Sequence, residues 1–298
     1  MKIAICRFVF AIQVGGAFPA MAQMSAHTHE HPGQPSGVSP GVQLLLDSAN
    51  KSIARYEDRK FAIANGYRLV GTDLPSMGEH WLNTRLLIDG VHDLAQPELL
   101  TYLKVGGRTV LTGVVYAVPL TQGQTAPAVF GPQAVWHEHN GAIDDEALLP
   151  EHHSAPSAVS GTRVTFVHAW LRVPHPGGVF AAENWAIPFV RAGLPVPQEF
   201  PDGAARALGL LDGGRKFFTA LMGVDASASA SAALDQCIVI ATAIVTAARA
   251  ETRALTRSEL EVLDDAWQRL LQDVTAQSGL ETAKRINGGT KPQDAVHH

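Results

Sequence analysis

Residues 97–119, PELLTYLKVGGRTVLTGVVYAVP, decide the fold of this chain. Two runs rich in leucine, β-branched and aromatic residues lie on either side of Gly106 and Gly107. A glycine pair between two such runs is typical of a β-hairpin, because tight turns need backbone angles that other residues avoid. The stretch therefore predicts two antiparallel strands joined by a glycine turn.

Further strands are predicted on both sides of this hairpin. Residues 128–139 and 163–173 have strand-like composition, and residues 78–81 form a shorter strand-like stretch. Before them, apolar residues recur at helical spacing from Val42 to about Asn65. Residues 42–200 are therefore predicted to form an α+β unit with an N-terminal helix and an antiparallel sheet, which could curve into a barrel.

The C-terminal part of the chain, residues 201–298, is predicted to be helical, because strand signals stop after Pro201. Thr256 and Glu259 have the spacing of a capping box, in which each side chain bonds to the other residue's backbone at a helix start. The stretch from Ile238 to Val245 is apolar around most of a helix circumference, so its helix is expected to be buried. The predicted helices span residues 203–222, 230–252 and 257–277.

The N-terminus has the pattern of a secretory signal peptide. Lys2 and Arg7 precede a short apolar run over residues 8–17, and Ala20-Met21-Ala22 supplies the small residues of a cleavage site. Residues 1–22 are therefore predicted to be removed after Ala22. The mature protein is expected to be periplasmic or secreted.

Residues 23–41 are rich in Gly, Pro and Ser, which predicts a disordered leader. The leader carries His27, His29 and His31. Histidines at this spacing could collect divalent metal ions weakly. A solvated linker without that role is the alternative.

The charge of the chain argues against a nucleic-acid partner. Cleavage after Ala22 takes Lys2 and Arg7 from the 23 basic residues and none from the 28 acidic ones, so the net charge becomes −7. Without a basic surface, no counterion release drives phosphate binding. A membrane span is not expected either, because Asp235 and Arg249 bracket too few apolar residues.

Histidines beside tryptophans mark the stretches most suited to chemistry. His137 and His139 alternate along one strand and so share a face, and His168 shares a face with Trp170. His80 lies next to Trp81 and could join them. Neutral imidazoles in an apolar wall bind Zn, Cu, Fe or Mn without the cost of burying an anion. The sequence therefore predicts a mononuclear metal site with His80, His137, His139 and His168 as ligands.

Two other functions remain compatible with these residues. A metalloenzyme of hydrolase, lyase or oxidoreductase type could use the same metal, with Glu183 as the general base. Alternatively, a metal-free domain could bind a small molecule in a pocket lined by tryptophans. The tryptophans considered for that pocket are Trp81, Trp136, Trp170 and Trp185.

Overall fold

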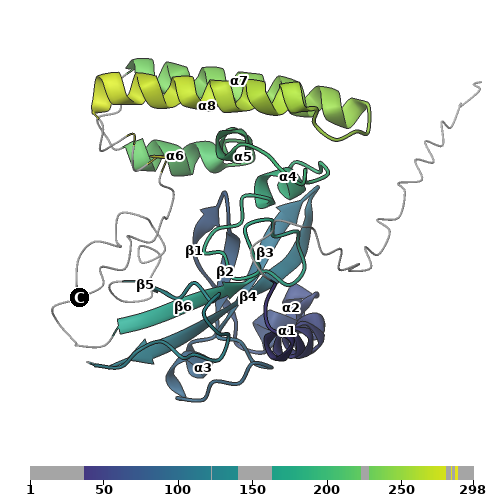
Figure 1. Ribbon diagram of the computed structural model, residues 1–298, viewed down its shortest axis with the longest axis vertical. Coiled ribbons are helices and arrows are strands. Elements are labelled where there is room, and N and C mark those ends of the chain that lie inside the picture. The colour runs from purple at the N-terminus through teal and green to yellow at the C-terminus, as the bar shows by residue number, and fades with distance from the viewer. Residues whose placement is uncertain are drawn as a thin grey trace, which may run out of the picture. The chain divides into compact units, whose positions relative to one another are not determined.

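The part of the chain that the structure describes, in a computed structural model, comprises residues 37–121, 123–139, 163–222, 228–279, 283, 286 and 287 (Figure 1). The predicted signal peptide over residues 1–22 and the leader histidines His27, His29 and His31 lie outside these residues. The described residues from Val38 onward belong to one unit.

An antiparallel sheet organises the first half of this unit (Figure 1). Among the described residues it has six strands in the order β1-β2-β3-β4-β6-β5, and every neighbouring pair is antiparallel. The sheet is open, with β1 and β5 at its edges, so it does not close into a barrel. The strands are β1 (Arg68–Leu74), β2 (Gly78–Leu82), β3 (Leu99–Val105), β4 (Arg108–Leu120), β5 (His137–His139) and β6 (Arg163–Ala169).

The hairpin expected over residues 97–119 is confirmed as β3 and β4. Two other strand predictions were too long: the stretch 128–139 is extended as a strand only in β5, and the stretch 163–173 ends as a strand at Ala169. After Ala169 the regular ladder stops: Trp170 N donates to the carbonyl of Val179, and Arg172 N makes one more bond to β4, at the carbonyl of Thr112.

The N-terminal helices pack on one face of the sheet. These are α1 (Pro40–Ile53), the 3-10 turn η1 (Ala54–Tyr56) and α2 (Arg59–Ala64). Their apolar residues form one buried cluster with Trp81, Leu100 and Tyr102 of the sheet. The single helix predicted over residues 42–65 is therefore interrupted. It restarts at Asp58, whose side chain accepts from Lys60 N and caps α2.

The helices that follow the sheet form the C-terminal helical region, as predicted. Within the predicted range these are α5 (Asp202–Gly209), α6 (Gly214–Met222), α7 (Ala228–Ala250) and α8 (Arg257–Ser278). Two short helices were not predicted: α4 (Ile187–Arg191) precedes this range, and α3 (Thr84–Ile88) lies between β2 and β3. The capping box of Thr256 and Glu259 is confirmed at the start of α8. The helix predicted over residues 203–222 is instead two helices, because Asp212 and Gly213 adopt positive φ angles of 52° and 100° between them.

Helices α7 and α8 run side by side, and α5 packs against both (Figure 1). Their shared core includes Cys237 and Trp267, which are buried. Burial raises the pKa of the Cys237 thiol to about 12, as expected for a cysteine that fills space in a core.

Candidate functional site

His80 of β2 and His168 of β6 meet in the interior of the protein. Their Nε2 atoms are 3.1 Å apart and their rings are nearly perpendicular, at 81°. Both residues are buried, with exposed fractions of 2% and 3%. They come from strands that are separated in the sheet by β3 and β4.

Strand pairing places these histidines on the same sheet face. His80 is paired with Thr101, and Thr101 is paired with Gly113. Two residues further along β4, Val115 is paired with His168. Paired residues point to the same face of a sheet, and so do residues two apart in one strand. This face is the one opposite to Trp81, Tyr102 and the N-terminal helices.

The strands between the two histidines are bent and closely packed. A Cβ on Gly113 would lie 2.3 Å from the carbonyl oxygen of Ala169, so only glycine fits there. The β3–β4 register shifts next to Thr101, and Thr112 Oγ1 donates to Thr101 Oγ1 over 2.8 Å. Such an irregularity bends a strand and increases its twist. This bend lies between β2 and β6, whose histidines His80 and His168 approach each other.

A stack of parallel rings fixes the orientation of His168. The ring of Trp170 lies 5.1 Å from that of His168 and parallel to it within 5°, and the ring of His137 lies 5.5 Å away and parallel within 4°. Trp170 is itself held by its Nε1, which donates to the carbonyl of Ala181 over 2.7 Å. His168 thus has little freedom to rotate away from His80.

His137 brings a third imidazole to this region. Strand β5 pairs His137 with Phe166, two residues before His168 in β6. His137 Nδ1 is 3.2 Å from the carbonyl oxygen of Val135. When Nδ1 donates to that carbonyl, the ring lone pair is on Nε2, which is the arrangement that metal-bound histidines commonly have.

Of the four predicted ligands, the structure places His80 within 3.1 Å of His168 and stacks the ring of His137 on that of His168. His139 is paired with Val164 at the backbone level, on the same strand as His137, and its side chain lies outside the described part of the structure. No group of three or more His, Cys, Asp or Glu side chains within the described residues has the geometry of a metal site. The described donors that converge are His80 and His168.

Glu183, the predicted general base, lies beside Trp185. Its Oε2 accepts from Trp185 Nε1 over 2.9 Å, and the guanidinium of Arg206 lies 4.2 Å from the centre of the Trp185 ring. Burial lowers the pKa of Arg206, and the negative charges of Glu183 and Asp202 oppose that shift.

The four tryptophans do not share one pocket, because Trp81 and Trp170 lie on opposite faces of the sheet. Trp81 packs with Tyr102 on the helix-covered face, and its Nε1 donates to Glu79 Oε2. Trp136 lies near Phe130, with 6.4 Å between ring centres.

A buried carboxyl group, Glu98, was not singled out from the sequence. It has an exposed fraction of 1% and its Oε2 accepts from Ala117 N over 3.1 Å, where β4 extends beyond the start of β3. Burial raises the pKa of Glu98 to about 7, and the charges of Asp89 and Asp93 add to the increase. The only sign in the sequence that Glu98 could be buried is its position directly before the strand-like run of residues 99–103.

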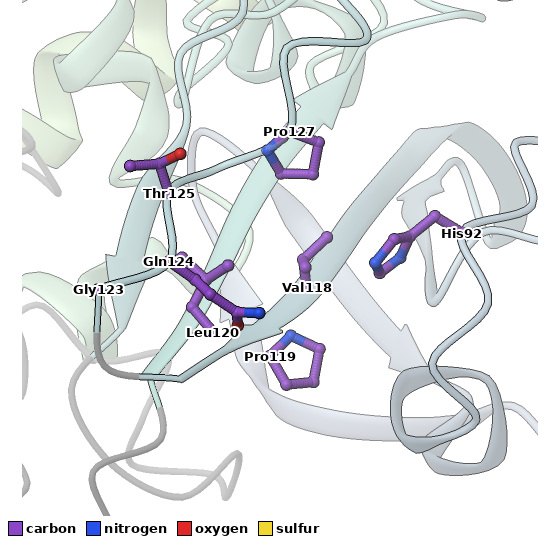
Figure 2. A pocket seen from close by; sticks show the side chains of 8 residues that line it. All are labelled: His92, Val118, Pro119, Leu120, Gly123, Gln124, Thr125 and Pro127. Carbon is purple, nitrogen blue, oxygen red and sulfur yellow. The ribbon is translucent and has the colours of Figure 1, made fainter.

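An open pocket of about 450 Å³ lies near Glu98. Figure 2 shows His92 on one side of this pocket and the loop of residues 123–127 on the other, with Val118 and Pro119 of β4 between them. His92 Nδ1 is 4.0 Å from Glu98 Oε1. The residues of the pocket are His92, Val118, Pro119, Leu120, Gly123, Gln124, Thr125 and Pro127, and none of the predicted metal ligands is among them.

The chain matches no protein-family model, no curated protein and no solved structure. Its function is therefore inferred from its own residues.

Proposed function

We propose that this is an exported protein that binds a transition metal through histidines on one face of its sheet, with His80 and His168 as the central ligands and His137 and His139 completing the set. The observation that carries the proposal is the 3.1 Å separation of two buried Nε2 atoms. Two nitrogens that bind one tetrahedral Zn at about 2.1 Å are roughly 3.4 Å apart. The observed spacing is within a few tenths of an ångström of that value, and a bound ion would replace the proton that the two Nε2 atoms share in their hydrogen bond.

The donor chemistry favours a transition metal over magnesium or calcium. Imidazole is a nitrogen donor of intermediate softness, which suits Zn, Cu, Fe and Mn, whereas Mg and Ca prefer oxygen. Burial of a neutral imidazole avoids the cost of burying an anion. Among divalent first-row metals, nitrogen sites bind Cu most tightly, so Zn and Cu are the first ions to test.

Neighbouring groups would restrict the orientation of the histidines before the ion binds. The Trp170 ring keeps His168 in place, and the carbonyl of Val135 can orient His137. Ligands that are already ordered lose little entropy when the metal binds. A site of this kind is expected to bind one ion per chain and to outcompete the leader histidines.

Metal content of the purified protein tests this proposal. Wild type, His80→Ala, His168→Ala and the control His92→Ala would be loaded with Zn, dialysed and analysed by mass spectrometry of the elements. His92 is a suitable control because its side chain is half-exposed and lines the open pocket near Glu98, away from the proposed metal ligands. We expect one Zn per chain in wild type and in His92→Ala, and loss of most of it in the other two variants. Full retention in His168→Ala, with circular dichroism showing a folded protein, would refute the assignment.

A further inference from the structure

Helix α7 carries no charge between Asp235 and Arg249, yet the protein covers only one side of it. Leu234, Cys237, Ala241 and Val245 are buried against α5 and α8. Only 28% of the most apolar window of α7 is buried, and the side chain of Val239 on the outer side is 60% exposed. The expectation that this helix is buried therefore holds for one side only.

The outer face of α7 is one continuous stripe along the helix. Its residues follow one another at alternating steps of four and three, which is the repeat that keeps one stripe of a helix facing a partner helix. All of them are exposed: Ala232, Gln236, Val239, Ala243, Thr246 and Ala250.

This outer face has no charged residue between Asp235 and Arg249. Helix α8, which has nearly the same length, carries Arg257, Glu261 and Asp265 on its exposed side. A helix exposed to water normally has such charges. The outer face of α7 is therefore suited to contact with another apolar surface.

We propose that the outer face of α7 binds the same face of a second copy of the chain, with the two helices antiparallel. In this alignment Val239 lies opposite Ala243 of the other copy, and Gln236 lies opposite Thr246. The small side chains allow the two helices to approach closely. The arrangement is self-complementary, as a two-fold dimer requires.

Charge complementarity supports this occupant and this direction. Antiparallel pairing brings Asp235 of each copy close to Arg249 of the other, whereas parallel pairing would place each charge beside its like. Both side chains are held at the ends of the face, because Asp235 pairs with Arg215 over 2.7 Å and Arg249 Nε donates to the carbonyl of Ala192. Antiparallel helices also have favourably opposed dipoles.

The same face could in principle lie against a membrane, since α7 is the one helix in the described part of the chain that is long and apolar enough to span one. A span needs about 20 residues without charges. The stretch from residue 236 to residue 248 is shorter than that. A second copy of α7 has an uncharged stretch of the same length, and it has charged residues at both ends that can pair with those of the first copy.

One helix from each copy makes a small interface, so we expect a reversible dimer that dissociates on the order of tens of micromolar. Sedimentation velocity of the exported chain from about 1 to 200 µM would measure it. Val239→Glu should weaken the dimer by about tenfold or more, because each copy then places a charge in the contact. Val262→Glu on α8, at a residue that is 42% exposed, is the matched control and should change nothing.

Exchanging the charges of residues 235 and 249 distinguishes a lost contact between the two copies from a loss of folding stability. Asp235→Arg and Arg249→Asp should each weaken the dimer, and the double variant should restore it. A chain that remains monomeric at 200 µM would overturn the proposal, as would a double variant that stays as weak as the single ones. Flotation of the wild type with phosphatidylglycerol vesicles, lost in Val239→Glu, would point to a membrane instead and would also overturn it.

Discussion

Replacing Glu98 by Gln should make the protein more stable at neutral and alkaline pH. The carboxyl is buried, and its pKa is raised from the ordinary value of 4.5 to about 7. In the unfolded chain the group ionises near pH 4.5, whereas in the folded chain it stays protonated until about pH 7. Tighter proton binding by the folded chain therefore contributes to the free energy of unfolding. This contribution is fully present below pH 4.5 and is lost as the pH rises through 7.

The size of this effect follows from the difference between the two pKa values. Each unit of difference corresponds to about 1.4 kcal/mol, so the free energy of unfolding of the wild type should fall by about 3 kcal/mol relative to Glu98→Gln between pH 4.5 and pH 8. The amide that this substitution introduces carries no charge at any of these pH values. Its oxygen can still accept from Ala117 N, as the carboxyl does.

Urea unfolding followed by tryptophan fluorescence would measure this difference at half-unit steps from pH 4.5 to pH 8.5. Other titrating groups are common to both proteins and cancel in the comparison. Glu199→Gln, at an exposed residue, is the control and should show a nearly constant difference from wild type. A difference between wild type and Glu98→Gln that does not change with pH, or that changes in the opposite direction, would refute the reasoning.

Four further predictions concern the histidine site. Gly113→Ala should lower the free energy of unfolding by about 1–3 kcal/mol and weaken metal binding, because the added methyl group would lie 2.3 Å from the Ala169 carbonyl; thermal unfolding and metal titration check this, and Gly41→Ala, which meets no atom within 4 Å, is the control. Azide should change the visible spectrum of the Co-substituted protein if three histidines bind the ion and leave one position open, and an unchanged spectrum would argue against the metalloenzyme alternative. In the same protein, Glu183→Gln should leave the amount of bound Co unchanged. Deletion of residues 23–36, which stops before Val38 and the N-cap Ser39 of α1, should remove only weak metal uptake, and calorimetry that finds no binding to the shortened chain would place the site in the leader instead.

Local sequence signals predicted the elements whose geometry is set locally. The glycine turn of the hairpin and the capping box at Thr256 depend on residues that are close in sequence, and both are confirmed. The interruptions at Asp58 and Asp212 were not predicted, because apolar spacing continues across them and tertiary packing decides where the helix ends. Strand β1 was missed because its burial along the chain does not alternate.

The part of the candidate site that depends on residues close in sequence was also predictable. Alternation along a strand placed His168 and Trp170 on one face, and the structure stacks their rings. The approach of His80 to His168 joins strands that β3 and β4 separate, and a register shift beside Thr101 lies between them; periodicity reveals neither feature. The burial of Glu98 depends on how far β4 extends beyond β3, so its raised pKa could be found only from the structure.

X-ray absorption spectroscopy of the Zn-loaded protein tests the central claim most directly. The proposed site predicts a first shell of nitrogen atoms at about 2.0–2.1 Å, with the outer-shell scattering of imidazole rings. His80→Ala and His168→Ala should each lose this signal, and His92→Ala should keep it. A first shell that contains only oxygen, or an imidazole signal that persists in both site variants, would contradict metal binding by these histidines.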